Sequence, residues 1–420
     1  MQKMDMKSTR RSFLKTVGTI GTGAVLAGIP NQADALEKKS IEAETAAQIP
    51  ARPFGKTGVS VSMLSLGGVL DVSDQIVFRQ AVNMGITYWD TAEGYQWGNN
   101  EKAIGKYFER FPEDREKIFL ATKSGTSNPT MLTENLNQSL DRMKTSYVDL
   151  FMIHHVSDAK EELTGEVRLW AEKMKANGTI RLFGFSTHKN METCLIEGAQ
   201  LGWIDGIMMS YNYRLMGQDR MKKAVEQCEK AGIGLTAMKT QAAFSARFYS
   251  TIGSESDEAL RMTDRFMKKG YTAEQAKLKA VWENKAIASI CSAMPNMTIL
   301  QANAATALNQ NELSLSDKHI LNVYAQQTSS GYCAGCARIC ESAIGFSVPI
   351  SDLFRYAMYK NSYGDSKRAM RWFHNLPEKT RRMIPRIDYA KAEMVCPQKI
   401  EIGKVIRKEY EAFIRPGEFV

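Results

Sequence analysis

The sequence lacks any apolar run long enough to cross a membrane, since a spanning helix needs about 18 or more such residues. It also lacks the basic and aromatic motifs of known nucleic-acid-binding modules, so we expect no DNA or RNA partner. No Gly-x-Gly-x-x-Gly follows the first predicted strand, which argues against an open dinucleotide-binding sheet. With 420 residues, 44% of them hydrophobic, the chain can form one large and one smaller globular domain.

The net charge of +9 is unevenly distributed along the chain. Residues 331–420 carry 16 basic and 10 acidic side chains, and the middle of the chain is close to neutral. One interpretation is a solvated basic surface. The other is a basic region that balances an anionic cofactor or faces an acidic partner.

The N-terminal segment has the features of an export signal. Thr9–Lys15 contains the pair Arg10 and Arg11 followed by Ser-Phe-Leu-Lys, which matches the twin-arginine pattern. A short, glycine-rich apolar stretch and the small-x-small sequence Ala33-Asp34-Ala35 come next. We therefore predict a twin-arginine signal peptide over residues 1–35 and a polar linker over 36–50. The twin-arginine translocase would then be a partner, and the mature protein would be periplasmic.

Strand and helix patterns alternate over residues 51–312. Eight short β-branched or apolar runs are separated by amphipathic stretches of helical period, such as 74–84, 131–143, 161–176 and 221–231. Eight such units predict an α/β fold, a (β/α)₈ TIM barrel, with an open doubly wound sheet as the alternative. The predicted strands are Val61–Leu66, Ile86–Tyr88, Ile118–Thr122, Val148–Ile153, Ile180–Phe185, Ile204–Met209, Ile233–Ala237 and Ala288–Cys291.

Four polar residues follow the C-terminal ends of neighbouring predicted strands, where barrels of this type carry their chemistry. They are Asp90, Tyr95, Lys123 and His154. An ammonium at Lys123 favours tyrosinate, so we expect it to lower the Tyr95 pKa and make the phenol a proton donor. Asp90 would keep Lys123 charged, and His154 would orient a substrate oxygen. Because side chains alternate along a strand, we expect only His154, and not His155, to face the barrel mouth.

These residues lie in segments that resemble the aldo-keto reductase family. Asp90–Glu101 resembles the family's Asp-Thr-Ala signature with its Tyr, Gly and Glu, while Ala121–Gly125 and Asp149–His155 resemble its lysine and histidine strands. Phe183–His188 and Pro53–Gly68 resemble two further segments of the family. The resemblance covers about 260 residues and implies that Asp90, Tyr95, Lys123 and His154 form the family's catalytic tetrad.

The resemblance also implies a nicotinamide nucleotide, NADP(H) or NAD(H), as cofactor. Ser186 matches the residue that contacts the nicotinamide amide, and Asn303, in a segment that resembles the family's phosphate-binding helix, matches an Asn near adenine. Four further positions depart from the family's usual residues. Thr187 replaces an Asn, Met208 a Gln, Met238 a stacking aromatic, and Asn296 an Arg at the 2′-phosphate.

Cysteines cluster near the C-terminus. Cys333-x₂-Cys336-x₃-Cys340 supplies three thiols, and Cys396-Pro397 resembles the close of a ferredoxin motif, in which the last Cys ligates the other cluster. The positions that a second cluster would need hold Ile344, Arg386, Tyr389 and Ala392. We therefore predict a mainly helical, ferredoxin-like iron–sulfur domain over residues 313–420 with one 4Fe–4S cluster.

A structural zinc ion or disulfides are the alternatives for these four cysteines. We expect the other three, Cys194, Cys228 and Cys291, to pack as small hydrophobic residues. We expect the aromatic residues of Ser351–Asn361 to pack as well, rather than to contact a cofactor.

The leading hypothesis is an exported oxidoreductase that interconverts a small-molecule carbonyl and an alcohol with a nicotinamide nucleotide. Its cluster would exchange electrons with a redox partner protein or stabilise the C-terminal domain. The alternative is an electron-transfer or ligand-binding protein whose barrel no longer transfers hydride. A third hypothesis is an exported sugar-modifying enzyme that keeps its nucleotide bound.

Overall fold

The computed structural model describes residues 47–70, 72–242, 264–270, 272–309 and 311–414. The predicted signal peptide at 1–35 and the linker up to residue 46 lie outside the described residues. No helix in the described part of the chain has both the length and the apolar character that a membrane span requires.

Eight parallel strands close into a barrel. Each strand pairs with its sequence neighbour, and β10 pairs with both β9 and β3. This closed order confirms the predicted (β/α)₈ barrel and excludes the open sheet. The strands are β3 (Leu64–Gly67), β4 (Tyr88–Asp90), β5 (Phe119–Ser124), β6 (Val148–Ile153), β7 (Ile180–Thr187), β8 (Gly206–Ser210), β9 (Gly234–Met238) and β10 (Ile287–Ala293).

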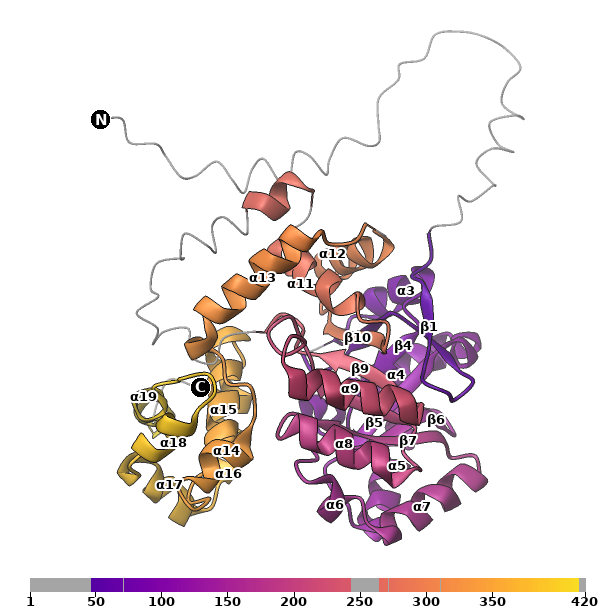
Figure 1. Ribbon diagram of the computed structural model, residues 1–420. Coiled ribbons are helices and arrows are strands. Elements are labelled where there is room, and N and C mark those ends of the chain that lie inside the picture. The colour runs from indigo at the N-terminus through magenta and orange to yellow at the C-terminus, as the bar shows by residue number, and fades with distance from the viewer. Residues whose placement is uncertain (1–46, 71, 243–263, 271, 310, 415–420) are drawn as a thin grey trace, which may run out of the picture. The chain divides into compact units, whose positions relative to one another are not determined.

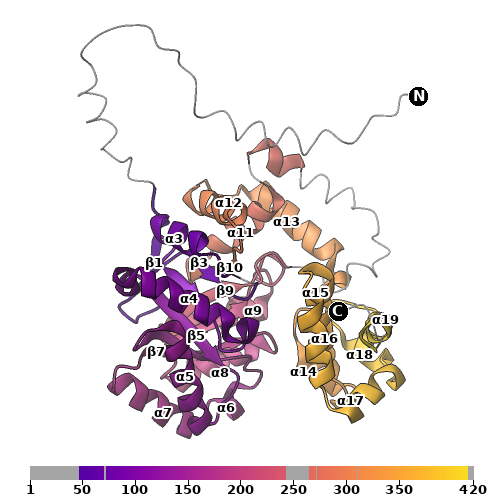
Figure 2. The same ribbon diagram turned by 180° about the vertical axis from the view of Figure 1, so that it is seen from behind.

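Helices surround these strands (Figure 1), and Figure 2 shows the same arrangement from behind. Their apolar faces and the outer faces of the strands form one large buried core. The helices are α3 (Gln75–Asn83), α4 (Asn99–Arg110), α5 (Pro129–Met143), α6 (Ala159–Glu162), α7 (Gly165–Ala176), α8 (Met191–Leu201), α9 (Asp219–Ala231), α11 (Ala273–Trp282), α12 (Met297–Leu308) and α13 (Leu315–Gln327), with 3₁₀ turns η1 (Tyr95–Gly98) and η2 (Pro112–Lys117).

Two predicted elements are each divided in the structure. The predicted strand Val61–Leu66 spans the end of β2 (Ser60–Ser62), which pairs with β1 (Ala51–Pro53) in an antiparallel hairpin, and most of the barrel strand β3. The predicted helix over residues 161–176 breaks into α6 and α7, because the Thr164 side chain accepts a hydrogen bond from the Val167 amide and so begins a new helix.

The hairpin places Phe54 in the N-terminal end of the barrel. This ring is fully buried and packs against Tyr88 and Phe119, with ring centroids 6.3 and 5.4 Å away. β8 and β9 both begin with glycine, and a Cβ on Gly206 or Gly234 would lie 2.8 or 2.4 Å from the nearest Phe54 ring atom. The two glycines therefore provide the space that the ring fills.

We expect Gly234→Ala to destabilise the fold by about 1–3 kcal/mol, because the added methyl group overlaps Phe54 in a closely packed core. Urea unfolding would measure the change. Gly217→Ala is the matched control, since its Cβ meets no atom within 4 Å. Equal stability of the two variants would contradict this account of the barrel end.

A helical region follows the barrel. Leu321 in α13 and Tyr332 still belong to the barrel core, and a second apolar core begins at Cys340. Between residues 333 and 414, all of them described, every regular element is a helix. After the short η3 turn (Ser329–Gly331), the elements are α14 (Ala337–Ser342), α15 (Ile350–Ser362), α16 (Ser366–Asn375), α17 (Glu378–Met383), η4 (Ile384–Arg386), α18 (Ala390–Val395) and α19 (Ile402–Ile414).

Candidate active site

The C-terminal ends of β4, β5 and β6 bring together the four residues predicted as catalytic. The Lys123 ammonium contacts the Asp90 carboxylate, Nζ to Oδ1, at 2.6 Å. It also donates to the Tyr95 hydroxyl at 3.3 Å, and the Tyr95 ring lies 5.6 Å from the His154 ring, centroid to centroid. Parallel strands end at the same edge of a barrel, so residues far apart in the sequence meet there.

The loop that carries Tyr95 is held in an uncommon conformation. Gln96 and Trp97 have φ values of 45° and 60°, in the left-handed region that most side chains avoid. The Gln96 side chain donates to the Val69 carbonyl at 2.7 Å and so ties this loop to the loop after β3. Backbone strain of this kind persists where the surrounding contacts hold it and is common at functional sites.

The electrostatics of the tetrad differ from the sequence-based prediction. Burial raises the pKa of Asp90, and Lys123 opposes that shift. Burial, followed by the charges of Asp90 and Tyr359, raises the pKa of Tyr95 well above its usual value. The prediction of a net lowering of the Tyr95 pKa is therefore wrong for this structure. The phenol remains protonated at neutral pH, which is the form that a proton donor needs.

Three histidine rings form a row that leads away from Tyr95. The His154 and His155 rings stack with centroids 3.6 Å apart, and His188 lies 5.3 Å beyond His155. All three line the same cavity, so the prediction that only His154 faces the barrel mouth is wrong. Strand alternation does not apply here, because β6 ends at Ile153 and His155 has a φ of 67°.

Burial, then the neighbouring positive charges, lowers the pKa of His154 and His155 well below the usual value. Below pH about 6.5 the unfolded chain takes up protons that these folded imidazoles do not, so stability falls as the pH falls. Between pH 7.5 and 5.5 we expect the free energy of unfolding to fall by about 1.4 kcal/mol for each of these two imidazoles.

Urea unfolding at the two pH values tests this expectation. His155→Asn should show a loss smaller by about 1.4 kcal/mol than the wild type, because one of the two groups is removed. An identical pH dependence in wild type and variant would contradict the assignment of neutral, buried imidazoles.

The tetrad opens into a cavity of about 400 Å³. Barrel loops form part of the wall, and the helical region supplies the rest. Within Ser351–Asn361, Tyr359 is buried and packs in the second apolar core as expected, and it also lines the cavity from α15. The lining residues from α15, α16 and the turn between them are Tyr359, Tyr363, Arg368, Arg371 and Trp372.

Lys239 and Tyr359 contact each other in the wall of this cavity. The Lys239 ammonium donates to the Tyr359 hydroxyl at 3.4 Å and lies 4.7 Å from the ring centroid. Burial raises the pKa of Tyr359, but Lys239, Arg368 and Arg355 together shift that pKa below its usual value. A second tyrosine–lysine pair, contributed partly by the helical region, thus shares the cavity with Tyr95 and Lys123.

Cys291 near the end of β10 also lines the cavity, where its thiol interacts electrostatically with Asp90. It is partly buried and packs against the apolar core inside the barrel, and Cys194 and Cys228 are fully buried, so all three pack as expected. Burial and the Asp90 charge raise the pKa of Cys291 well above its usual value, so it is a thiol at neutral pH. Its place near a strand end is the signal in the sequence that could have identified it.

The predicted nucleotide contacts divide into two groups. Met208 and Met238 line the cavity beside the tetrad. Ser186 and Thr187 are buried next to it, where the Ser186 hydroxyl accepts from the His155 amide at 3.2 Å and the Thr187 hydroxyl donates to the Lys189 carbonyl at 3.0 Å. These four positions could therefore contact or shape a bound nicotinamide.

Asn296 and Asn303 lie at α12. The Asn296 side chain caps this helix by accepting from the Ile299 amide at 3.0 Å. The Asn303 amide donates to the Ser292 hydroxyl at 3.0 Å, and Ser292 lines the cavity. The helix predicted for a phosphate-binding segment is thus present at one edge of the site.

The four predicted ligand cysteines surround one small cavity in the helical region, whose other lining residues include Ile350, Phe354 and Ile402. No disulfide joins any of the seven cysteines, all of which are described. Burial, then mainly the neighbouring thiols, raises the pKa of Cys336 to about 11 and that of Cys340 to about 12. No group of three or more His, Cys, Asp or Glu side chains in the described part of the chain is arranged to hold a metal ion. The four cysteines are Cys333, Cys336, Cys340 and Cys396.

Comparison with known proteins identifies the family. The family model described as "Aldo/keto reductase family" matches residues 67–301. The uncharacterized oxidoreductase YrpG of Bacillus subtilis is 26% identical over 212 residues, which cover 44% of this chain and 64% of that protein. The aldo-keto reductase yakc of Schizosaccharomyces pombe, whose name specifies NADP(+), is 30% identical over 152 residues, or 33% of this chain and 42% of that protein.

This chain is thus a member of the aldo/keto reductase family, and its matches span less than two thirds of the length of either relative. A solved structure supports the barrel assignment. The aldo-keto reductase of Klebsiella pneumoniae, determined in complex with NADPH, is similar with a TM-score of 0.53 and 21% identity. The similarity covers 66% of this chain and 94% of that chain.

Proposed function

We propose that this protein is an exported oxidoreductase that interconverts a carbonyl compound and an alcohol in the barrel cavity. The observation that carries the proposal is the contact of one buried ammonium, at Lys123, with both the Asp90 carboxylate and the Tyr95 hydroxyl. In this arrangement Tyr95 gives its proton to the substrate oxygen. The nearby Lys123 ammonium then stabilises the resulting phenolate.

His154 orients the same substrate oxygen. Its imidazole is neutral, because burial and the adjacent cations lower its pKa, so it can donate one N–H without bringing a charge. A fixed neutral donor beside the developing alkoxide stabilises charge without requiring reorganisation of solvent. Asp90 keeps the Lys123 ammonium in place.

The cofactor of the proposed reaction is NADP(H) or NAD(H), which supplies or accepts the hydride when bound. Met208 and Met238 give the cavity an apolar wall beside the tetrad, and the buried His155 Nδ1 has no partner within the described residues. An apolar face and an unsatisfied polar atom suit a planar amide-bearing ring. The yakc protein, whose name specifies NADP(+), and the NADPH complex of the Klebsiella protein favour NADP(H).

The proposal includes one 4Fe–4S cluster held by Cys333, Cys336, Cys340 and Cys396. These four thiols line one small cavity, and four Cys thiolates are the ligands that such a cluster needs. Where a second cluster would need ligands, Tyr389 and Ala392 are buried in the apolar core. The cluster would pass single electrons to a redox partner protein or stabilise the helical region.

A twin-arginine signal over residues 1–35, and hence a periplasmic location, completes the proposal. Its support is the Arg10-Arg11 motif and the small-x-small sequence that follows. A translocase that carries folded proteins suits a chain that acquires an iron–sulfur cluster before export.

Anaerobic titration with NADPH and NADH tests the proposed function. Nucleotide fluorescence measures the binding, and the visible absorbance of the cluster is recorded at the same time. We expect saturable binding of the nucleotide to a brown protein. Brown protein that binds neither nucleotide would favour an electron-transfer or ligand-binding protein. Met208 and Met238, which replace an amide and an aromatic residue of the family, are the features consistent with that alternative. Colourless protein containing zinc would contradict the cluster assignment.

A further inference from the structure

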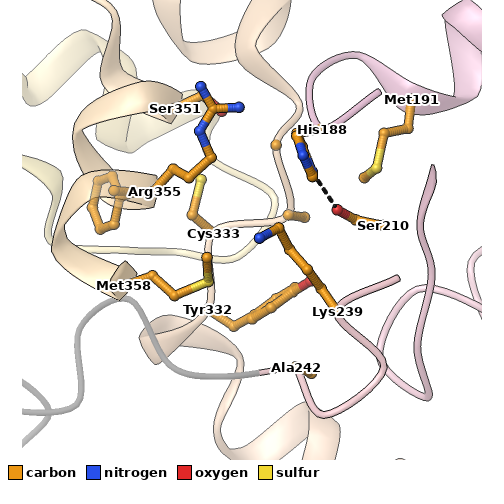
Figure 3. Close-up of a pocket in the computed structure, with 13 residues that line it drawn as sticks. His188, Met191, Ser210, Lys239, Ala242, Tyr332, Cys333, Ser351, Arg355 and Met358 are labelled. Carbon is orange, nitrogen blue, oxygen red and sulfur yellow. Dashed lines mark hydrogen bonds between the residues drawn. The ribbon is translucent and has the colours of Figure 1, made fainter. Parts of the chain in front are cut away.

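A second, smaller pocket adjoins the active-site cavity (Figure 3). Its volume is about 40 Å³, and His188 and Lys239 line both spaces. The barrel contributes Ser210 to one side, and α15 contributes Ser351 and Arg355 to the other. The pocket is therefore an extension of the cavity into the space between the barrel and the helical region.

Lys239 brings a positive charge to this pocket. In Figure 3 its ammonium points into the pocket, and no carboxylate of the described residues forms an ion pair with it. Within the described residues, the one hydrogen-bond partner of this ammonium is the Tyr359 hydroxyl, to which it donates at 3.4 Å. Lys239 has a φ of 55°, so the backbone holds this side chain at the end of β9 in a conformation that costs free energy.

Arg355 brings a second positive charge that is only partly balanced. One nitrogen donates to Asp352 at 2.8 Å, but the other oxygen of that carboxylate accepts from Lys189 at 2.7 Å. One carboxylate is thus shared by two cations. The Nε of Arg355 is buried and has no hydrogen-bond partner among the described residues. A buried donor without a partner is costly, and a ligand that accepts from it removes this cost.

The pocket wall supplies no carboxylate to offset these charges, and Cys333, a ligand of the proposed cluster, is its one group with acidic character among the described residues apart from Tyr332. Its lining contains no Asp or Glu, and burial with the neighbouring cations lowers the pKa of His188, which is therefore neutral. The His188 ring nitrogen Nδ1 lies 3.0 Å from the Ser210 hydroxyl, so the remaining polar groups are neutral donors or acceptors. The volume is enough for about three water-sized groups, which matches the three heavy atoms of a carboxylate better than the five of a phosphate.

We propose that the substrate of the carbonyl site carries a carboxylate, which binds in this pocket between Lys239 and Arg355. The proposal rests on the proposed function for the position of the carbonyl end, at Tyr95 and His154. The row of histidine rings connects the two ends of the site, so the substrate is a carbonyl or hydroxy acid whose two groups are separated by several carbon atoms.

A matched pair of aldehydes tests the proposal on the cluster-containing protein. Adipate semialdehyde and the corresponding amide differ in charge and hardly in size, and NADPH consumption gives kcat/KM for each. We expect a preference for the acid of roughly 10- to 100-fold, as for charge-assisted hydrogen bonds. This ratio should fall to near one in Lys239→Met and Arg355→Met, and recover in part in Arg355→Lys. Lys230→Met, an exposed lysine on α9, should retain the wild-type ratio.

Calorimetric titration with adipate separates this proposal from the proposed function. If neither aldehyde reacts but adipate binds, and if Lys239→Met abolishes that binding, the anion site is supported and the carbonyl chemistry is refuted. If both aldehydes react equally well and adipate does not bind, the proposed anion site is overturned. Tighter binding of inorganic phosphate than of adipate would also overturn it. So would a Lys239→Met variant that shifts the cluster potential but binds adipate normally. Lys239→Gln serves as the second variant where Lys239→Met does not fold.

Discussion

Replacing Tyr95 with phenylalanine is expected to lower kcat/KM for carbonyl reduction by about 100- to 10,000-fold, the range typical for loss of a positioned proton donor. The substitution removes only the hydroxyl that contacts Lys123 at 3.3 Å, and the ring can keep its contact with His154. Steady-state kinetics with NADPH would measure the loss. The visible spectrum of the cluster should not change.

Tyr147→Phe is the matched control for this experiment. Tyr147 lies outside the cavity, where its ring packs against the guanidinium groups of Arg115 and Arg181. Its variant should retain wild-type activity. Full activity in Tyr95→Phe would refute the role of the tetrad, and loss of activity in both variants would point to a general effect on the fold.

Tyr359→Phe distinguishes the two tyrosine–lysine pairs. Tyr359 reaches the cavity from α15, and the positive charges of Lys239, Arg368 and Arg355 shift its pKa below the usual value. If Tyr359 were the proton donor, its variant, and not Tyr95→Phe, would show the large loss. We expect the larger effect at Tyr95, because only that hydroxyl contacts the Lys123–Asp90 pair.

The barrel and its tetrad follow from local patterns in the sequence. The predicted strand Val148–Ile153 matches β6 at both ends, since a fully buried parallel strand is a nearly continuous apolar run, interrupted here only by Asp149. Asp90, Lys123 and His154 each lie at or just after a strand end. Their meeting is therefore a consequence of eight parallel strands closing into one barrel.

The rest of the site depends on contacts that no local pattern specifies. Tyr359 and Arg368 join the cavity because α15 and α16 pack near the loop after β3, where the Arg368 guanidinium donates to the Val69 carbonyl at 2.8 Å. That contact joins residues 299 positions apart. His155 enters through a left-handed backbone conformation beyond β6, which strand periodicity does not anticipate.

The direction of the shift in the Tyr95 pKa could not be predicted from the sequence either. The presence of a lysine beside a tyrosine favours a lower pKa, but the outcome depends on how deeply the pair is buried and on where Asp90 lies. In the structure, burial and the charge of Asp90 give a net rise in the pKa of Tyr95. The residue types at the strand ends therefore predict which side chains meet, but they do not predict the protonation states of those side chains.

Replacing Cys396 with alanine is expected to remove the iron–sulfur cluster. The cysteine ends α18, in a segment remote in sequence from the other three, and all four line the same cavity. Without the fourth thiolate, a 4Fe–4S cluster has an open coordination site and is lost readily. Iron content should fall from about four atoms per chain to below about one, with loss of the brown colour.

The same variant is expected to lower the thermal stability of the helical region, because the proposed cluster would join α14 to α18, which pack together beside a small apolar core. Cys228→Ala is the control, since this buried cysteine belongs to the barrel core and donates to the Leu195 carbonyl. It should retain full iron content. Iron content that is unchanged in Cys396→Ala would contradict the ligand assignment. A single zinc ion in the wild type, lost in this variant, would leave the four cysteines as ligands but make their role structural, because zinc transfers no electrons.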